Sequence, residues 1–465
     1  MADEHELIDR LLSDSALGEW LVRQRWFASK SGVLSGTEVF DAANVNDEQS
    51  LTLAIVLARF ATGTHELYQL PLGVRSGVTE GGGGHDGLIA TADGSAVLDG
   101  LTEPSRAAAL MARIDAAGEA ETRLGSFLFR RAEGTTPLPP RGTVRVLDIE
   151  QSNSSLVFSD RVVLKIYRRL EPGINPELEM LRFFGMQGFE QVAPLHGWYE
   201  YESPSLATTM GIAQEYVADA VGGWELALDE IAVDPEAFLA RLAQLGALTA
   251  SMHNTLALDA EDPAFSPEEP SAEWLALLTA TIDEEIEQLF LQLPPDERLG
   301  PIAGRGEDVR ARLAMRNRVG LSGRLIRTHG DYHLGQTLHS PRGWVVIDFE
   351  GEPARSLSDR RRKRSALRDV AGMLRSFAYL VAASSVLRGK VAPPEFEKRA
   401  REAFLGEYMA TVDRSLLPAG EAAIASLMSI FELERAIYEL HYEIEHRPEW
   451  VVIPVAGIQR LLESA

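Results

Sequence analysis

One stretch in the second half of the chain places two carboxylates and an amide at a spacing that suits phosphoryl transfer. Asp331 follows a short apolar segment, residues 325–326, and Gln336 comes five residues after Asp331. Asp348 ends a second apolar segment, residues 344–347, and we expect both segments to be strands. Phosphoryl transfer needs a carboxylate beside the attacking hydroxyl and oxygen ligands for magnesium, because catalysis depends on positioning and on neutralising phosphate charge. The spacing therefore predicts a kinase active site.

A strand lysine upstream could bind the nucleotide. Lys165 lies in a predicted strand, residues 162–167, and a predicted helix follows it. In a kinase the strand lysine holds the α and β phosphates and a helical glutamate pairs with its ammonium. Glu179, fourteen residues on, is the expected partner, and Glu177 is its nearest competitor. Alone, Lys165 is better explained as an edge-strand charge that keeps a sheet soluble, but the downstream carboxylates favour the nucleotide role.

No glycine-rich G-x-G-x-x-G loop accompanies Lys165. The turn between the predicted strands 144–149 and 155–158 is instead polar and small, so its hydroxyl and backbone N–H groups would have to hold the phosphates. The candidates are Ser152, Asn153 and Ser154. A later strand, residues 207–213, is expected to lead from the nucleotide lobe to the next lobe, where adenine would bind. The candidates there are Gln214, Glu215 and Val217.

Composition limits the classes of function. The 465 residues suffice for two or three domains. The 69 acidic side chains outnumber the 45 basic ones, and the net charge of −24 disfavours nucleic-acid and membrane partners. The chain has no cysteine, which excludes disulfides and thiolate metal sites. Because we find neither a signal peptide nor an apolar run long enough to span a bilayer, we expect a cytoplasmic protein.

The pattern of predicted elements divides the chain into three parts. Residues 1–100 alternate a helix with β segments and form an α+β module; its four consecutive glycines, residues 81–84, are best explained as a hairpin loop. Residues 101–217 are β-rich and carry Lys165, whereas residues 218–465 are mostly helical. The basic run at residues 358–369 is either a loop paired with acidic groups or a phosphate-facing patch, and nuclear localisation is a weaker third interpretation.

The last long helix predicted from the sequence has one face that could bind a sugar. Two aromatic rings and several polar groups fall at helical spacing along it: Arg435, Tyr438, Glu439, Tyr442 and Glu443. Rings can lie beneath the C–H faces of a sugar while polar groups bond to its hydroxyls. The competing explanation is partial burial with solvated ends, which is common for tyrosine and glutamate on a surface helix. Likewise, His253 within an apolar helix is expected to be a packed or capping histidine rather than a catalytic one.

Several blocks of the sequence resemble the maltokinases, ATP-dependent maltose 1-kinases related to the aminoglycoside phosphotransferases. The blocks are RQRWFASK, LKIYRRLEPGINPELEM, QEYVADAVGGWE, THGDYHLGQTL, IDFEGEP, RDVAGMLRSFAY and YELHYEIEHRPEWVVIPVAGI. The fourth block and the DFE of the fifth are shared with other small-molecule kinases. The EGEP, the DVAGMLRSF and the final block narrow the resemblance to the maltokinases.

The resemblance implies a bilobal, protein-kinase-like α+β fold with an N-terminal cap, a nucleotide lobe and a helical C-lobe. It implies transfer of the γ-phosphoryl group of ATP to the anomeric hydroxyl of maltose, a step toward α-glucan and glycogen synthesis from trehalose. Asp331 would be the base, with His333 as a further catalytic residue. Gln336, Asp348 and the adjacent Glu350 would bind Mg²⁺.

Other assignments remain open. The acceptor could be glucosamine, another aminosugar or an aminoglycoside, and a pseudokinase is a further class, although none of the expected catalytic residues is missing. The resemblance makes association with a trehalose synthase-type enzyme plausible, and the chain could be a monomer or a homodimer.

Overall fold

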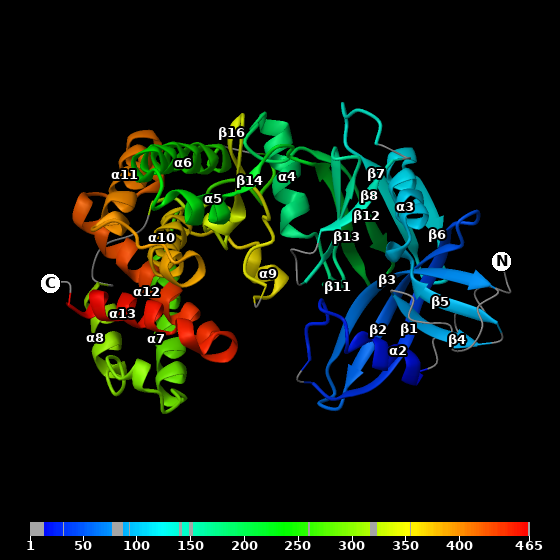
Figure 1. Cartoon of the computed structure of the whole chain (residues 1–465), viewed down its shortest axis with the longest axis horizontal. Helices are drawn as coiled ribbons and strands as arrows, with labels where there is room; N and C mark the ends of the chain where they lie inside the picture. The colour runs from blue at the N-terminus through cyan, green and yellow to red at the C-terminus, as the bar shows by residue number, and fades with distance from the viewer. Residues whose placement is uncertain are drawn as a thin grey trace. The chain divides into compact units, whose positions relative to one another are not determined.

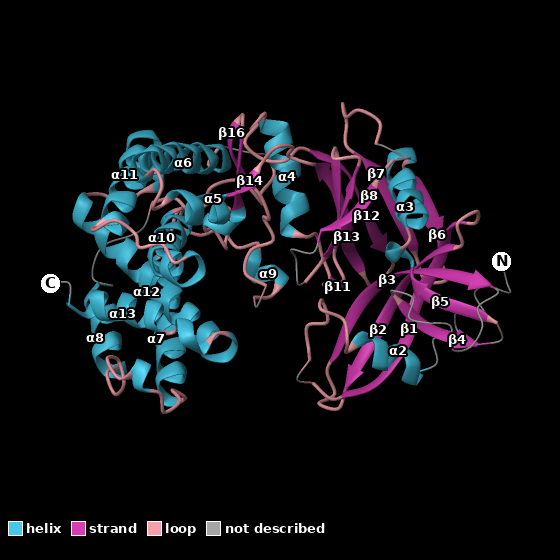
Figure 2. Ribbon diagram, viewed as in Figure 1, coloured by secondary structure: helices cyan, strands magenta, loops and turns pink. Residues whose placement is uncertain are grey.

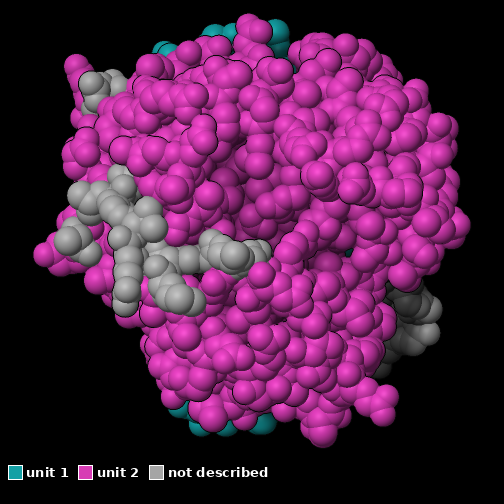
Figure 3. All heavy atoms as spheres, turned by 90° about the vertical axis from the view of Figure 1, so that its left-hand side faces the viewer, with its two compact units in different colours: residues 1–186, 193–218 teal, residues 187–192, 219–465 magenta. Residues whose placement is uncertain are grey.

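The computed structural model describes residues 14–30, 32–76, 87–92, 94–138, 142–147, 152–258, 261–316, 323–353 and 355–463. The chain divides into two compact units (Figure 3). Unit 1 comprises residues 1–186 and 193–218, and unit 2 comprises residues 187–192 and 219–465. Unit 1 is rich in strands and unit 2 is mostly helical (Figure 2), as the sequence predicts.

The first part of unit 1 contains a strongly apolar strand that is paired on both sides. Strand β2, Leu51–Phe60, is almost entirely buried because its alternate side chains enter two different cores. Leu53 and Ile55 enter one core, whereas Ala54 and Val56 enter the other. The sheet runs in the order β1-β2-β3-β5-β4, with β11 paired to β3. Its further strands are β1, Leu34–Asn46; β3, His65–Ser76; β4, Leu88–Ala92; β5, Ser95–Asp99; and β11, Arg169–Leu170. Two helices accompany it: α2, Asp14–Leu21, and α3, Pro104–Ala116.

The second part of unit 1 is a seven-stranded sheet in the order β6-β7-β12-β13-β10-β9-β8. Figure 1 labels β7, β12 and β13 of this sheet. Its strands are β6, Gly118–Glu121; β7, Ser126–Arg131; β8, Val144–Leu147; β9, Ser154–Phe158; β10, Val162–Ile166; β12, Leu195–Glu202; and β13, Ala207–Glu215. Helix α4, Pro176–Gln187, follows β11, and Asn175 accepts the Glu177 N–H at 2.8 Å as its N-cap. One core contains residues of both sheets, among them Leu53 and Leu164. The two sheets therefore fold as one body.

Unit 2 is mostly helical and contains a small three-stranded sheet in the order β14-β15-β16. The strands are β14, Val221–Gly222; β15, Thr337–Ser340; and β16, Gly343–Val346. The helices are α5, Gly223–Glu230; α6, Pro235–Leu256; α7, Ala272–Leu291; α8, Gly306–Arg316; α9, Leu357–Arg360; α10, Leu367–Arg388; α11, Phe396–Thr411; α12, Glu421–His446; and α13, Val452–Glu463. The unit also contains short 3₁₀ turns, among them η3, Leu334–Gln336, which directly precedes β15.

Helix α10 alone, among the described residues, is long and apolar enough to cross a membrane, but 61% of its apolar window is buried inside the protein. A buried helix that is apolar around its circumference is typical of a protein core.

Most predicted elements lie within a few residues of their observed bounds, with some differences. Residues 325–326 form isolated bridges to Glu268 and Arg364 rather than a strand of a sheet. Helix α3 ends at Ala116, and β6 begins at Gly118 with φ 117°. The four glycines at residues 81–84 lie outside the described residues. The boundary expected near residue 100 stays a prediction.

Candidate active site

A buried carboxylate on α10 holds the backbone of the catalytic loop. Asp369 Oδ2 accepts the His329 N–H at 2.8 Å, and its Oδ1 accepts the Gly330 N–H at 3.0 Å. Gly330 has φ 86°, a left-handed conformation that glycine adopts without strain. Gly372, one turn after Asp369, lets α10 approach the loop, since an added Cβ would lie 2.6 Å from the Tyr332 carbonyl oxygen. The Asp369 side chain thus fixes the loop through the loop's main-chain N–H groups.

His253 supports the same carboxylate from helix α6. Its Nε2 lies 3.3 Å from Asp369 Oδ2 and its Nδ1 lies 3.0 Å from the Tyr408 hydroxyl, with the ring wholly buried. Burial raises the pKa of Asp369, but the contacts with His253 and His329 and the bonded N–H groups outweigh it, so the pKa is lower than usual. His253 is therefore the packed histidine that the sequence predicts.

His329 joins the two predicted catalytic segments. Its Nε2 lies 2.9 Å from the Ile347 carbonyl oxygen, an acceptor, so Nε2 carries the proton. Its Nδ1 then accepts the Asp331 N–H at 3.4 Å. The ring also packs against Phe349, with centroids 4.8 Å apart. Asp331 and the residues around Asp348 are thereby held together through one imidazole.

The predicted magnesium ligands Gln336 and Asp348 are in contact. Gln336 Nε2 donates to Asp348 Oδ2 at 3.0 Å. Gln336 ends η3, where the His333 side chain accepts the Gly335 N–H at 3.1 Å as the N-cap. Asp348 follows β16 with φ 65°, a conformation that is uncommon for a non-glycine residue and that concentrates at functional sites. Glu350 follows two residues later and is partly buried.

Arg435 of α12 reaches the predicted base. Its Nη2 lies 2.9 Å from Asp331 Oδ1, an ion pair without the alignment of a hydrogen bond. The same guanidinium lies 3.2 Å from Glu352 and 3.8 Å from Glu439, and its Cζ stands 5.0 Å from the Tyr438 ring centroid. Burial lowers the pKa of Arg435, but the three carboxylates raise it above its usual value. Arg435 is therefore a fixed cation beside Asp331.

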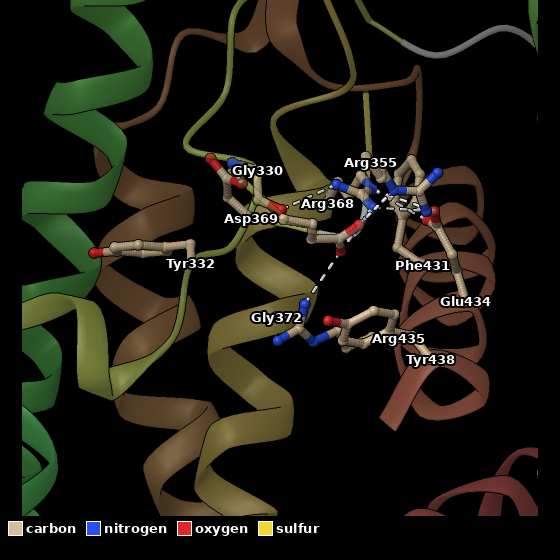
Figure 4. Close-up of a pocket in the computed structure, with 11 residues that line it drawn as sticks. Gly330, Tyr332, Arg355, Arg368, Asp369, Gly372, Phe431, Glu434, Arg435 and Tyr438 are labelled. Carbon is tan, nitrogen blue, oxygen red and sulfur yellow. Dashed lines mark hydrogen bonds and ion pairs between the residues drawn. The ribbon is translucent and has the colours of Figure 1, made fainter. Parts of the chain in front are cut away.

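Three arginines and two glutamates line a small cavity behind the loop (Figure 4). Arg368 lies 3.1 Å from both Glu352 and Glu434, and Arg355 contacts the same two carboxylates. Burial raises the pKa of Glu352, but Arg368, Arg435 and Arg355 outweigh it and lower the pKa to about 2. The cavity measures about 20 Å³, room for a single water rather than a sugar.

The other residues of the predicted sugar face differ in how far they are buried. Glu439 is buried and pairs with Arg375 at 2.6 Å. Tyr442 is 39% exposed and stacks on His446, with ring centroids 4.4 Å apart. The structure therefore brings Arg435, Tyr438 and Glu439 together near Asp331, whereas Tyr442 stands at the surface of the unit.

The predicted nucleotide residues belong to unit 1. Lys165 Nζ lies 3.0 Å from Glu177 Oε2, and both side chains are almost fully buried. Glu177, which the spacing gave as the competing partner, makes this ion pair, and the role expected of Glu179 stays a prediction. Glu177 stands in the first turn of α4, where a carboxylate is also stabilised by the helix dipole. Glu179 is buried one half-turn further on.

The remaining predicted nucleotide residues lie around the same strands. Ser152 and Asn153 precede β9, and Ser154 is its first residue. Gln214 and Glu215 end β13, so the strand extends past its predicted end at residue 213. Val217 follows and is buried.

The basic run contributes ion pairs rather than an open patch. Arg364 and Arg362 pair with Asp359 at 2.9 and 3.7 Å, and Lys363 pairs with Glu268 at 2.6 Å. This supports the acid-paired interpretation of residues 358–369.

Asp369, His329 and Glu352 were not assigned to the site from sequence. A signal for the first was present, because a charged residue within the apolar stretch of α10 demands a buried partner.

Two regions of the chain match known protein families. Residues 20–102 match the maltokinase N-terminal cap domain, and residues 143–352 match the phosphotransferase enzyme family. The chain carries a maltokinase cap followed by a phosphotransferase domain. The phosphotransferase match spans Lys165, the catalytic loop and Asp348.

Two curated relatives are glucosamine kinases. The one from Streptacidiphilus jiangxiensis is 27% identical over 354 residues, which cover 72% of this chain and 77% of the relative. The one from Mycolicibacterium smegmatis is 28% identical over 340 residues, covering 69% and 80%. Each aligns with most of its length to this phosphotransferase.

Solved structures share the fold. A glucosamine kinase in complex with glucosamine, ADP and inorganic phosphate is 22% identical, with a TM-score of 0.66 over 95% of this chain and 96% of the other. A second crystal form of a glucosamine kinase gives a TM-score of 0.69 over 96% and 97%. The expected kinase-like α+β fold, with a cap, β-sheet lobes and a helical C-terminal region, is confirmed.

Proposed function

We propose that this phosphotransferase is a sugar kinase that transfers the γ-phosphoryl group of ATP to the anomeric hydroxyl of maltose, giving maltose 1-phosphate. The observation that carries the proposal is the placement of Asp331, on a loop anchored by Asp369 and beside Arg435 and Tyr438. The bond between the γ-phosphorus and the bridging oxygen breaks while the acceptor oxygen bonds to phosphorus. Asp331 orients the acceptor hydroxyl and takes its proton.

Magnesium is the expected cofactor because of the donors that meet at the end of β16. Gln336 and Asp348 offer amide and carboxylate oxygens, the hard ligands that Mg²⁺ prefers, and they are already in hydrogen-bond contact. Glu350 is the proposed third member. When bound, the ion would neutralise charge on the transferred phosphoryl group.

A neutral acceptor is favoured by the charge beside the base. Any acceptor hydroxyl bonded to Asp331 lies close to the Arg435 guanidinium, 2.9 Å from the same carboxylate. An ammonium group on a neighbouring carbon would meet a like charge there, which is costly where little water screens it. The family cap adds support for maltose, and Glu439 and Tyr442 would extend the acceptor face.

Glucosamine is the second candidate acceptor, because two curated relatives and the similar solved structures are glucosamine kinases. The carboxylates around Arg435 could attract an amine if the guanidinium moved aside.

An acceptor panel tests the proposal. Maltose, glucose, trehalose, glucosamine and an aminoglycoside are each incubated with ATP and Mg²⁺, and ADP release and the phosphorylated position are measured. We expect maltose to be consumed and to carry the phosphate on its anomeric oxygen. Turnover of glucosamine alone would replace the maltose assignment, and turnover of none would contradict the kinase assignment.

The proposed product suggests a cellular setting. Maltose 1-phosphate would serve α-glucan and glycogen synthesis from trehalose in the cytoplasm, where ATP is available. Association with a trehalose synthase-type enzyme belongs to the same proposal, and co-purification from the native cell would test it.

A further inference from the structure

A short segment of unit 1 is shared between the cap and the predicted nucleotide site. Strand β10 carries Lys165, and after two residues the chain enters β11. There it leaves the nucleotide sheet and pairs with β3 of the cap, with Arg169 opposite Tyr68 and Leu170 opposite Leu67. The residues just after Lys165 are therefore held by the cap backbone.

Cap residue Gln69 acts on the ion pair of Lys165 through Tyr167. Gln69 Nε2 donates to the Tyr167 carbonyl oxygen at 2.7 Å, while the Tyr199 hydroxyl donates to Gln69 Oε1 at 2.8 Å. The Tyr167 hydroxyl donates to Glu177 Oε2 at 3.0 Å, the oxygen that pairs with Lys165. All five side chains are buried, so little water can replace these bonds.

Arg168 connects cap residue Asp99 to Ser154, one of the predicted phosphate-binding residues. Arg168 Nη2 donates to Asp99 Oδ2 at 2.5 Å, and Arg168 Nε donates to Ser154 Oγ at 2.8 Å. The guanidinium also stands 4.9 Å from the ring of Trp26, within the RQRWFASK block. Arg168 is 2% exposed, and its Nη1 has no hydrogen-bond partner in the described part of the chain. Its position therefore depends on these three contacts.

A second polar contact of the cap lies near the other edge of the same sheet. Asp41 Oδ2 accepts the Tyr201 hydroxyl at 2.6 Å and the Leu124 N–H at 3.2 Å, and Thr122 donates to the same oxygen at 2.5 Å. These partners belong to β12 and to the turn between β6 and β7, whereas Ser154 belongs to β9, beyond β13 and β10 in the sheet. Asp41 thus joins the cap to the sheet without touching the predicted nucleotide residues.

We propose that Asp99 and Gln69 of the cap are positioning residues for nucleotide binding. Asp99 holds Ser154 and its turn through Arg168, and Gln69 holds the Lys165–Glu177 pair through Tyr167. The cap then acts on the affinity for the nucleotide rather than on the acceptor. This inference rests on the proposed role of Lys165 and Ser154 in binding ATP.

Two isosteric variants test the inference, Asp99→Asn and Asp41→Asn. Each removes a buried charge at a contact of the cap, so both are expected to lower Tm. Because a bond between charged groups is worth more than a neutral one, Asp99→Asn should raise the KM for ATP and the Kd for Mg-ADP by about tenfold. Asp41→Asn should leave both constants within about twofold, and the acceptor KM should stay unchanged in both proteins. Equal nucleotide constants in the two variants would overturn the inference.

A double variant with Ser154→Ala distinguishes a positioning role of Asp99 from a general loss of stability. In a Ser154→Ala background, Asp99→Asn should raise the Kd for Mg-ADP by much less than tenfold, because the route from Asp99 has already been cut. If Asp99→Asn does not fold, Arg168→Lys replaces it, since lysine keeps the charge but cannot bond to both partners as the planar fork does. An undiminished effect of Asp99→Asn without Ser154, or wild-type Kd in Arg168→Lys, would contradict the proposal.

Lys165→Met distinguishes failure of this inference from failure of the proposed function. If Lys165→Met binds Mg-ADP with wild-type Kd in isothermal titration, the nucleotide does not use Lys165 and the proposed site is wrong. If Lys165→Met loses binding and Asp99→Asn does not, the site stands and the positioning role of the cap is refuted.

Discussion

The catalytic loop and the acceptor helix α12 hold their charged groups in different ways. Asp369 fixes the loop through two main-chain N–H groups, so the position of Asp331 follows from the backbone. On α12, in contrast, Arg435 and Glu439 are held by ion pairs between side chains. Arg435 contacts Glu352 and Glu439, and Glu439 also pairs with Arg375. Anchoring through the backbone gives the loop one fixed geometry. In a network of ion pairs, the remaining members still hold one another when a single member is removed. Substitutions in the loop should therefore cost far more activity than substitutions on α12.

The largest effect is expected at Asp331 itself. Asp331→Asn keeps the shape of the side chain but removes the base, so kcat should fall by roughly two to four orders of magnitude. The KM for ATP should stay close to that of the wild type, because Asp331 has no proposed contact with the nucleotide. Steady-state kinetics with saturating acceptor measures both constants. Wild-type turnover in this variant would break the assignment of the base.

The next largest effect is expected at the anchor of the loop. Asp369→Asn places an NH₂ group against donors and leaves buried partners uncompensated, so the free energy of unfolding should fall by roughly 3–5 kcal/mol. kcat should fall as well, since a displacement of about 1 Å at a reacting group can cost on the order of a hundredfold. Urea unfolding and kinetics are measured together.

Asp413→Asn is the matched control for Asp369→Asn. Asp413 also accepts a main-chain N–H, that of Ser415 at 2.8 Å, but at an exposed turn. Its loss should change the free energy of unfolding by about 1 kcal/mol or less and leave kcat unchanged. Equal losses in the two variants would show that the anchor has no special importance.

The sequence could predict which residues meet within one continuous stretch, such as the catalytic loop. Asp331, Gln336 and Asp348 lie within eighteen residues, so their spacing along two connected segments was enough to place them together. The spacing gave Glu179 as the partner of Lys165 and Glu177 as its competitor. Both lie in the first turn of α4, so the contact between Lys165 and Glu177 depends on the three-dimensional path of the helix.

The long-range partners were beyond the reach of spacing arguments. Arg435 lies 104 residues after its partner Asp331 in the sequence. Asp99 lies 69 residues before its partner Arg168. Pairing of this kind depends on how separate elements pack, and a single sequence contains no local signal for it.

Glu352 allows the α12 network to be tested through pH. Its pKa is lowered to about 2 from an unfolded value of roughly 4.3, so its ion pairs stabilise the folded state above about pH 4.3 and this contribution is lost as pH falls toward 2. At pH 7 Glu352→Gln should lower the free energy of unfolding by roughly 3 kcal/mol at most, and the gap should shrink below about pH 4.3. Chemical unfolding of both proteins at several pH values checks this. A gap that does not change with pH would show that lost packing, rather than charge, is responsible.

The smallest effect is expected at Tyr442, the outermost residue of the proposed acceptor face. Its ring is 39% exposed and already covered on one side by His446, with the Arg447 guanidinium 5.2 Å from its centroid. A sugar could gain only an edge contact there, so Tyr442→Ala should raise the acceptor KM by about threefold and leave kcat and Tm near wild type. Tyr438→Ala, in contrast, removes the ring that stands 5.0 Å from the Arg435 guanidinium and should affect both kcat and KM. A larger loss at Tyr442 than at Tyr438 would place the acceptor at the surface end of α12 and away from Asp331, which would refute the arrangement of base and acceptor proposed above.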